Sequence, residues 1–412
     1  MTRLERSPTT TLAPRADADN RPEGRLQAEE LEARVETVAA LAEDNAADVD
    51  REARFPTEAI DAARAQRLMG IMVPRELGGE GASLSAVADI CYRLGRACAS
   101  SAMIYAMHQI MVACLLRHKG NSAWHEGLLR RLCAEQLLLA SSTTEGRGGG
   151  NLRSSEAAIE ASGSRITLER RATVISYGAN ADAIVTTARR AADAAASDQI
   201  LVVFLKEDYS LEPLVAWNTL GMRGTCSAGF TLRGSGEADQ ILPEPYEAIH
   251  PQTMVPVSHL AWASVWAGIA AGSVERAQFF VRNAARQAGG QLPPGAAHYT
   301  TATASLVTLR GLVASSLQRF EQAAHDRQKL ASLDFQTMVN LTKVEASELA
   351  VATVMAAFRA CGLSGYRDDG EYTMGRYLRD VLSSPIMINN DRILANVGAS
   401  SLLSPVPSAL RG

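Results

Sequence analysis

The sequence predicts an α+β protein that is mainly α-helical, with an N-terminal helical domain, a small central β-domain and a C-terminal four-helix bundle. Residues 28–137 are rich in Ala and Leu, with apolar residues at helical spacing. Short β-rich runs separated by Gly, Asp and Ser replace this pattern after residue 138, and long Ala-rich segments return from Met254 onward. We therefore expect an N-terminal domain at 29–137, a β-domain at 138–246 and a C-terminal domain at 247–412.

The N-terminal region divides into a tail and a helical part. Residues 1–28 are rich in Thr, Pro, Arg and Asp and have little to bury, a composition typical of a disordered tail. In the helical part, the Gly- and Pro-containing run at residues 73–81 (VPRELGGEG) predicts one well-marked loop.

The other two domains have their own local patterns. Residues 184–187 (IVTT) and 200–204 (ILVVF) are predicted strands of the β-domain. In the C-terminal domain, three segments are each long enough for a multi-turn helix: residues 261–288, 300–327 and 337–361.

Composition restricts the class of protein. The chain has 412 residues, of which 47% are hydrophobic, enough for a sizeable core. Its 41 basic and 45 acidic residues nearly balance, without a basic block interleaved with aromatic residues, so we do not expect nucleic acid as a partner. The six cysteines are scattered without zinc-ligand spacing, so we expect free thiols and no metal. We find no secretory signal or membrane-spanning run, so the expected location is the cytoplasm.

Seven short motifs occur in an order that is known from one family. They are residues 73–79 (VPRELGG), 144–151 (TEGRGGGN), 175–182 (ISYGANAD), 220–225 (LGMRGT), 268–270 (GIA), 362–366 (GLSGY), and Arg376 with Arg379-Asp380. In these motifs and in its helix, strand, helix layout, the chain resembles the acyl-CoA dehydrogenase family over nearly everything beyond the tail. The resemblance implies the fold of that family and a flavin-dependent oxidoreductase.

The same resemblance shows that a catalytic group is missing. In the family, a Glu in the stretch after Arg-Asp removes the α-proton of an acyl thioester as hydride leaves for the flavin. The matching position here is Ile388, and the alternative base position of branched-chain relatives falls on Ser258. Neither side chain is a carboxylate, so the ordinary mechanism is not expected to operate.

Hydrogen-bonding residues occupy the positions that contact the flavin in the family. The resemblance implies that Ser142, Thr144 and Ser176 lie against the isoalloxazine edge, where donors stabilise the charge that develops on reduction. Ser and Thr are also typical of turns at strand ends, which is the alternative interpretation. The adjacent loop has Gly150 where a Ser usually contacts the thioester, which weakens the inference to a CoA substrate.

The resemblance implies further cofactor contacts from Arg286, Gly362 and Asn390. The expected cofactor is FAD. A Phe-Gly pair that the family uses at the adenine end of the flavin is replaced here by residues 288–290 (AGG), so FMN is the alternative.

Three residues are candidates to replace the missing base. Asp391 lies three positions beyond Ile388, although a helix cap or an ion pair with Arg392 is the alternative role. His108 lies on a helix that lines the acyl cavity in relatives, and imidazole titrates near neutral pH, although a lone His on an apolar helix is often a core residue. His259 falls where many relatives place an Arg that meets the CoA adenine.

Three functions follow from these observations. The first is an FAD-dependent oxidoreductase that oxidises an acyl thioester of CoA or a carrier protein with a non-standard base. The second is a monooxygenase or oxidase of the same fold that uses reduced flavin and O₂, and the third is a flavin-binding or structural member without chemistry. Family members are usually homotetramers built as dimers of dimers. An electron-transfer flavoprotein or a flavin reductase is the expected redox partner.

Overall fold

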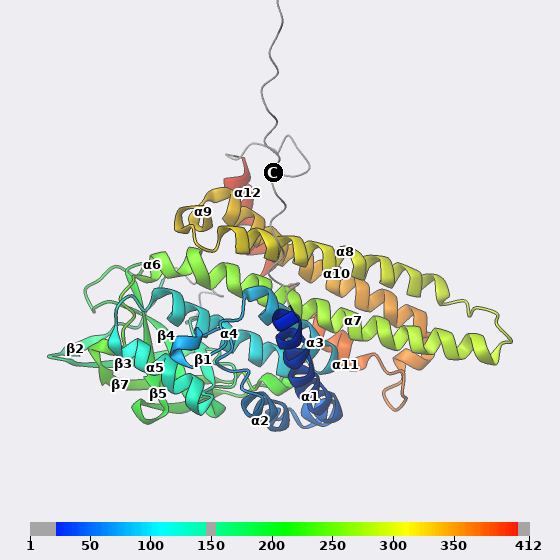
Figure 1. Cartoon of the computed structure of the whole chain (residues 1–412), viewed down its shortest axis with the longest axis horizontal. Coiled ribbons are helices and arrows are strands. Elements are labelled where there is room, and N and C mark those ends of the chain that lie inside the picture. The colour runs from blue at the N-terminus through cyan, green and yellow to red at the C-terminus, as the bar shows by residue number, and fades with distance from the viewer. Residues whose placement is uncertain (1–21, 146–153, 403–412) are drawn as a thin grey trace, which may run out of the picture.

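The computed structural model describes residues 22–145 and 154–402, and it has the predicted mainly helical α+β architecture (Figure 1). The N-terminal region consists of α1 (Pro22–Glu52), α2 (Thr57–Ala65), α3 (Leu84–Ala97), α4 (Ala99–His118) and α5 (Ala123–Glu135). Helix α1 begins inside the predicted tail, and residues 1–21 of that tail lie outside the described residues. The predicted loop at residues 73–81 separates α2 from α3.

Serine caps mark the starts of several helices. Ser83 Oγ accepts a hydrogen bond from the backbone N–H of Ala86 at the start of α3 (3.2 Å), and Ser122 Oγ does the same for His125 at the start of α5 (3.3 Å). Such caps satisfy backbone donors that have no partner within the helix.

The central region contains two small β-sheets. Strands β1 (Leu139–Ser142), β4 (Ala183–Arg189) and β5 (Gln199–Leu205) form one sheet, in which β1 and β4 are parallel. The other sheet is antiparallel, with the order β2 (Glu160–Ser162), β3 (Arg165–Ala172), β7 (Gly229–Glu237) and β6 (Tyr209–Val215). The two predicted strands are confirmed as parts of β4 and β5. Alternating burial along β3 places every second side chain in the domain core.

The C-terminal region returns to helices. It begins with α6 (Tyr246–Ile249), a π-helical turn (His250–Met254) and α7 (Val255–Gln287), which are continuous with one another. The remaining helices are α8 (Ala296–Ala323), α9 (Arg327–Ala331), α10 (Leu333–Tyr366), α11 (Gly375–Val381) and α12 (Asn390–Ser401). The three predicted long helices are confirmed as α7, α8 and α10.

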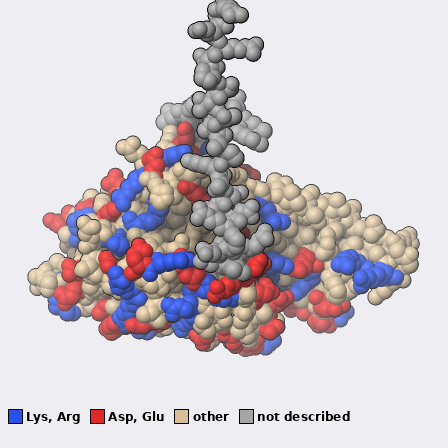
Figure 2. Space-filling model, in the orientation of Figure 1, with Lys and Arg blue, Asp and Glu red and all other residues tan. Residues whose placement is uncertain are grey.

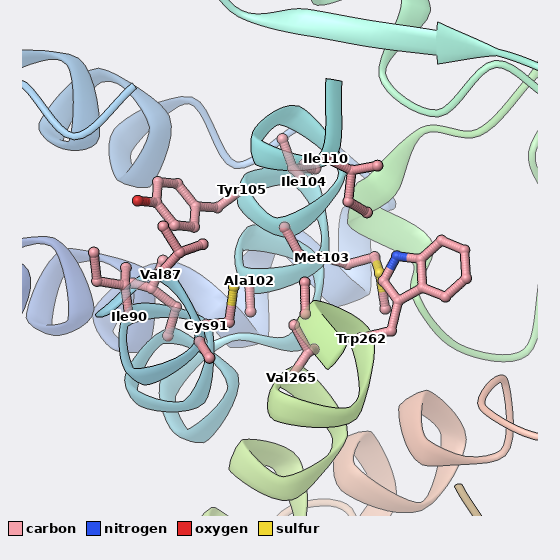
Figure 3. Packing of buried hydrophobic residues seen from close by; sticks show 14 of the residues in the cluster. Val87, Ile90, Cys91, Ala102, Met103, Ile104, Tyr105, Ile110, Trp262 and Val265 are labelled. Carbon is pink, nitrogen blue, oxygen red and sulfur yellow. The ribbon is translucent and has the colours of Figure 1, made fainter. Parts of the chain in front are cut away.

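Two glycines allow α3 and α7 to touch. A Cβ on Gly268 would lie 2.2 Å from the backbone oxygen of Tyr92, and one on Gly95 would lie 2.6 Å from that of Val265. Side chains from α3, α4 and α7 converge around this crossing in one continuous core (Figure 3). The GIA motif therefore has a packing role, because only glycine permits this approach.

Two of the sequence motifs join the three regions. A Cβ on Gly221 would lie 2.1 Å from the backbone oxygen of Arg379, and Asp380 Oδ1 accepts a hydrogen bond from the N–H of Met222 (2.6 Å). The guanidinium of Arg379 forms a bidentate pair with the carboxylate of Asp50 on α1. Burial raises the pKa of Asp380 to about 6, although its hydrogen bond to Met222 opposes the shift.

Among the described residues, three helical segments are long and apolar enough to cross a membrane by length and composition: Ala99–His118, Tyr246–Gln287 and Leu333–Tyr366. Their most apolar windows are respectively 89%, 100% and 50% buried inside the fold. Core packing therefore accounts for the apolar character of the first two.

Charged residues of both signs are intermixed over much of the face shown in Figure 2. The part of that face formed by α8 is largely uncharged.

Candidate functional site

A cavity of about 1020 Å³ lies where the β-domain meets the C-terminal helices. In Figure 1, α6, α9 and α12 gather at the end of the long helices beside the β-domain. The cavity is lined by the start of β5, by α6 and the first turn of α7, by the start of α10, and by the segment from Ile388 to Val397. A volume of this size accommodates a drug-sized ligand or a cofactor.

The π-helical turn sets which residues face this cavity. Tyr246 and His250 are four positions apart, as are Val255 and His259, and all four line the cavity. The step from His250 to Val255 is five positions and crosses the π-helical turn. A π-turn adds one residue to a helical turn, so it keeps both pairs on one face.

Ile388 occupies the cavity wall in a backbone conformation that is unfavourable for it. Its φ is 56°, and that of Asn389 is 42°, in the left-handed region that costs a β-branched residue free energy. The Ile388 side chain is partly buried and packs against a small apolar cluster of Val344, Ile393 and Val397. The position that the resemblance matches to the family base is therefore an apolar part of the cavity wall.

A buried lysine holds the segment around Ile388. Lys343 of α10 is fully buried; its Nζ donates to the backbone oxygen of Ser384 (3.1 Å) and to Oδ1 of Asn390 (2.6 Å), and it lies 5.5 Å from the ring centroid of Trp266. Asn390 Nδ2 in turn donates to Glu348 Oε1 (2.8 Å). Burial lowers the pKa of Lys343 to about 8.

His259 lies beside this lysine and lines the cavity. It is 3% exposed, its ring hydrogen-bonds to the backbone of Val339, and Nδ1 has no hydrogen-bond partner among the described residues. Burial, followed by the charge of Lys343, lowers the pKa of His259 to about 3. His259 is therefore neutral near pH 7 and a weak proton acceptor.

His108 lies away from the cavity and uses both of its ring nitrogens. Nε2 lies 2.8 Å from the backbone oxygen of Met69, and Nδ1 accepts a hydrogen bond from the N–H of Leu139 (3.0 Å). Burial lowers its pKa to about 4. This geometry gives His108 a structural role in joining α4 to β1, and the catalytic role inferred from the resemblance stays a prediction.

Asp391 and Asn390 differ in burial. Asp391 is exposed in the first turn of α12 and is not part of the cavity lining, although its neighbour Arg392 is. The Asn390 amide is buried and occupied by Lys343, Ser347 and Glu348. A cofactor contact from Asn390 would compete with these bonds.

The residues expected at the flavin edge lie at the end of β1 and beside it. Ser142 is buried, and its Oγ has no hydrogen-bond partner in the described part of the chain. Thr144 is partly exposed just beyond it. Ser176 Oγ accepts a hydrogen bond from Ser227 Oγ (2.8 Å). Residues 146–151 of the TEGRGGGN motif, including Gly150, lie outside the described residues.

Glu145 stabilises this end of the β-domain. Its carboxylate accepts backbone hydrogen bonds from Glu156 (2.6 Å) and Ala157 (3.1 Å) and lies 3.6 Å from the fully buried guanidinium of Arg170. Burial lowers the pKa of Arg170 to about 10. A buried cation of this kind needs its carboxylate partner.

Arg286 and Gly362 lie far from the cavity. Arg286 is exposed in the last turn of α7, and Gly362, at φ 54°, kinks α10 near its C-terminal end. The structure therefore does not bring these two positions together with Ser142, Thr144 and Ser176 in this chain.

Sequence reasoning missed several residues of the site. Tyr246, His250 and Asn340 line the cavity, and Lys343 lies behind its wall. The signal for Lys343 was present, because it is a lysine in the middle of a long Ala-rich segment of apolar character. The sequence contains no comparable signal for Tyr246, His250 or Asn340, since their roles depend on the π-helical turn and on contacts between distant segments.

Comparison with known proteins bears on this geometry. Residues 28–136 match the family described as acyl-CoA dehydrogenase, N-terminal domain, and residues 260–384 match acyl-CoA dehydrogenase, C-terminal domain. Probable acyl-CoA dehydrogenase fadE25 of Mycobacterium leprae is 24% identical over 380 residues, which cover 89% of this chain and 94% of that protein. Amino sugar nitrososynthase DnmZ of Streptomyces peucetius is 26% identical over 383 residues, which cover 89% and 90%.

A solved structure has the same fold. FMN-bound TdsC from Paenibacillus sp. A11-2, a dibenzothiophene monooxygenase, superposes with a TM-score of 0.81 at 18% identity and covers 92% of this chain and 98% of its own. The fold is thus the fold of that structure. The two family matches together span more than half of the sequence, and the chain belongs to the acyl-CoA dehydrogenase superfamily.

Proposed function

We propose that this chain is a flavin-dependent monooxygenase that uses reduced flavin and O₂. The observation that carries this proposal is Ile388, an apolar side chain in the cavity wall at the position of the family base. The alternative base position, Ser258, is a buried hydroxyl. A monooxygenase needs no α-proton base, so the absence of a carboxylate from both positions is compatible with this reaction.

The other candidate bases support the same choice. The side chain of Asp391 is exposed outside the cavity lining, and His259 is held neutral with a pKa of about 3. The carboxylates that do line the cavity are those of Asp198 and Glu247, at its β-domain end. Asp198 is paired with Arg190 (3.2 Å). Neither carboxylate is at a position that the family uses for proton abstraction.

The residues at the end of β1 fit a flavin. Ser142 presents a buried hydroxyl with unused hydrogen-bond capacity, and Ser176 is held in a chain of hydroxyls with Ser227 and Thr225. These groups would bind the polar edge of the isoalloxazine and orient it. When bound, a reduced flavin supplies the electrons that activate O₂ for transfer of one oxygen atom to the substrate. FMN and FAD both fit this role, and we expect a flavin reductase to supply the reduced cofactor.

The cavity wall suggests the kind of substrate. Gln336, Thr337 and Asn340 on α10 line the cavity together with Tyr246 and His250, so polar groups line much of it. The relatives named for nitrososynthase and dibenzothiophene monooxygenase reactions support oxidation of a small molecule at a heteroatom.

Dehydrogenation of an acyl thioester is the second candidate, favoured by the relative named as a probable acyl-CoA dehydrogenase. An electron-transfer flavoprotein would then replace the reductase as partner.

The first experiment follows the flavin spectrum anaerobically with a panel of acyl-CoA thioesters. In parallel, O₂ uptake is measured with NADH and a flavin reductase, with catalase present to correct for uncoupled peroxide. Substrate-dependent O₂ uptake without bleaching supports the monooxygenase, and bleaching by a thioester overturns it.

A pair of variants sharpens this test. Ile388→Glu restores a carboxylate at the family position, and Ile388→Gln is its uncharged control. If the chain is a dehydrogenase that lacks its base, only Ile388→Glu accelerates bleaching. For the proposed monooxygenase, neither variant bleaches.

A homo-oligomer is part of the proposal. Exposed apolar side chains lie on the helices far from the cavity, including Val307 on α8, which is 64% exposed, and Leu363 and Tyr366 on α10, which are 74% and 76% exposed. Figure 2 shows the uncharged area that α8 contributes. Apolar surface of this kind is typical of subunit contacts. Sedimentation of the full chain tests it, and a monomer would contradict it.

A further inference from the structure

A second cavity of about 220 Å³ adjoins the π-helical turn. It lies between the end of α4, the turn itself and the connection from α8 to α9. Its lining residues are Arg117, His118, Gln252, Ala324, His325 and Arg327. None of these lines the large cavity, whose wall ends at the neighbouring Pro251.

A directional chain of hydrogen bonds holds the walls of this cavity. Arg117 Nε donates to Thr253 Oγ1 (3.1 Å), which lies 2.8 Å from His118 Nε2; His118 Nδ1 lies 2.8 Å from Glu244 Oε2. Glu244 Oε1 is 2.9 Å from Nη2 of Arg327. A guanidinium only donates and a carboxylate only accepts, so the Thr253 hydroxyl donates to His118, whose Nδ1–H donates to Glu244.

The chain of bonds leaves one cation without a counter-ion. Glu244 pairs with Arg327, but Arg117 has no carboxylate within ion-pair distance in the described part of the chain. Nη2 of Arg117 donates instead to the backbone oxygen of Ala324 (2.7 Å). Burial, followed by the nearby charge of Arg327, lowers the pKa of Arg117. The guanidinium is partly buried, and its carbon lies 6.0 Å from the centroid of the Phe320 ring. A fixed guanidinium without a carboxylate partner is stabilised further when an anion joins it.

We propose that the second cavity binds an oxyanion of the phosphate class between Arg117 and Arg327. Guanidinium groups bind phosphate oxygens through paired N–H donors, and both arginines line the space. The cavity has room for a phosphate group with ordered water but is smaller than the roughly 300–1,000 Å³ typical of whole-ligand pockets.

The neighbouring glutamine adds hydrogen-bonding capacity. Gln252 lines the cavity, and its Oε1 is buried without a partner among the described residues. The oxygen and nitrogen of an amide exchange places by a half-turn, which presents N–H donors instead. A bound anion would also fix the turn that carries Thr253, and the same turn carries His250 of the large cavity. The two cavities therefore share this turn as part of their walls.

The competing role for Arg117 is a cap on α8. Its bond to Ala324 lies at the C-terminal end of that helix, where the helix dipole favours a cation. A cap of this kind needs no anion, so the two roles differ in whether phosphate binds.

Thermal unfolding of the full chain distinguishes them. Inorganic phosphate replaces chloride at constant ionic strength over the low-millimolar range, with wild type, Arg117→Met, Arg327→Met and the control Arg319→Met, an exposed arginine on α8. We expect a saturable rise in Tm for wild type and the control, and affinity at least about tenfold weaker in the other two variants. A linear rise shared by all four proteins is the general effect of excluded phosphate and would overturn the proposal.

Two further measurements keep the test decisive if Arg117→Met does not fold. Arg117→Lys keeps the charge, and arginine side-chain NMR of the wild type follows the guanidinium groups directly. Phosphate-dependent shifts of Arg117 and Arg327 support the site, and unshifted signals at both overturn it. ADP serves as a phosphorylated probe. Affinity equal to that of phosphate indicates a free-anion site, tighter binding indicates the phosphate group of a larger ligand, and no binding of either overturns the proposal.

Discussion

Two of the buried histidines, His108 and His259, differ in how completely their surroundings satisfy their hydrogen-bonding groups. His108, at the junction of α4 and β1, has a backbone partner on each ring nitrogen. His259, at the junction of α7 and α10, leaves Nδ1 without a partner in the described part of the chain and stands beside Lys343, which has no carboxylate within ion-pair distance there. Both histidines are neutral, and burial is the main reason in each case.

This difference in hydrogen bonding distinguishes a histidine that stabilises the core from one that borders a cavity. Buried polar groups in proteins are nearly always hydrogen-bonded, so a junction such as that of His108 contributes to stability. Unused hydrogen-bonding capacity occurs at His259 and Tyr246 beside the large cavity and at Ser142 on β1, and also at buried groups elsewhere among the described residues, such as Ser101 and Gln109 on α4. Of these groups, Tyr246 and His259 line the large cavity, so they are the ones that a ligand in that cavity would reach.

The largest expected effect is on stability at the completed junction. His108→Ala leaves the oxygen of Met69 and the N–H of Leu139 unpaired and opens a cavity, so we expect the free energy of unfolding to fall by about 3 kcal/mol. His259→Ala is the matched control and should cost less, because it breaks a single bond. Urea unfolding monitored by circular dichroism measures both. A stable His108→Ala protein that binds flavin but has lost turnover would instead support the catalytic role.

The next effect concerns Lys343 and depends on pH. The pKa of Lys343 is lowered from 10.5 to about 8, so between these values the folded protein has released a proton that the unfolded chain retains. As pH rises from 8 to 10.5, the free energy of unfolding of the wild type should therefore increase by about 3 kcal/mol relative to that of Lys343→Met. Urea unfolding of both proteins at several pH values across this range measures their free energies of unfolding. Groups that titrate in both proteins contribute equally, so their effects cancel in the difference. Parallel curves would show that Lys343 titrates normally.

Ser142→Ala tests whether an incomplete polar group serves a ligand. Its Oγ has no partner within the described residues, so the flavin-free protein should lose no stability. Flavin affinity should fall several-fold, on the order of 1 kcal/mol, because a hydrogen bond to the cofactor is removed. Titration with FMN and FAD, followed by fluorescence, gives the affinities. Unchanged binding of both flavins would place Ser142 outside the cofactor site.

The smallest effect is expected at Ile388. Ile388→Gly removes a partly buried side chain but relieves a φ of 56°, and these contributions oppose each other. We expect a change in stability below about 1 kcal/mol. Ile393→Gly, in the α-helical backbone of α12, lacks this relief and should cost clearly more. Equal losses in the two variants would show that the Ile388 backbone is not strained.

The architecture was largely predictable because its signals are local. Apolar runs at residues 184–187 and 200–204 became β4 and β5, and the Ala-rich segments became α7, α8 and α10. The alignment of motifs also placed Ile388 where the structure has a cavity wall. Hydrophobic periodicity and short motifs are properties of neighbouring residues, so a single sequence contains them.

The chemistry of the two cavity walls was less predictable because each wall brings together residues that are distant in the sequence. One network joins Arg117, Thr253, Glu244 and Arg327, although Arg117 lies more than a hundred positions before the other three. No spacing rule connects residues that lie so far apart in the sequence. The resemblance indicated Asp391 as a candidate, yet its position in the first turn of α12 exposes its side chain. Side-chain direction depends on local backbone geometry that a linear pattern does not contain.

The π-helical turn constrains how this chain can change during evolution. Loops tolerate insertions and deletions, but each residue of a helix rotates the downstream part of that helix by about 100°. The π-turn already holds one extra residue, so deleting one residue between His250 and Met254 would convert it to an ordinary α-helical turn and keep His259 facing the large cavity and Gly268 facing α3. A second deletion would have no π-turn to absorb it and would rotate both residues away from their partners. We therefore expect the length of this segment to vary by no more than one residue among close homologues.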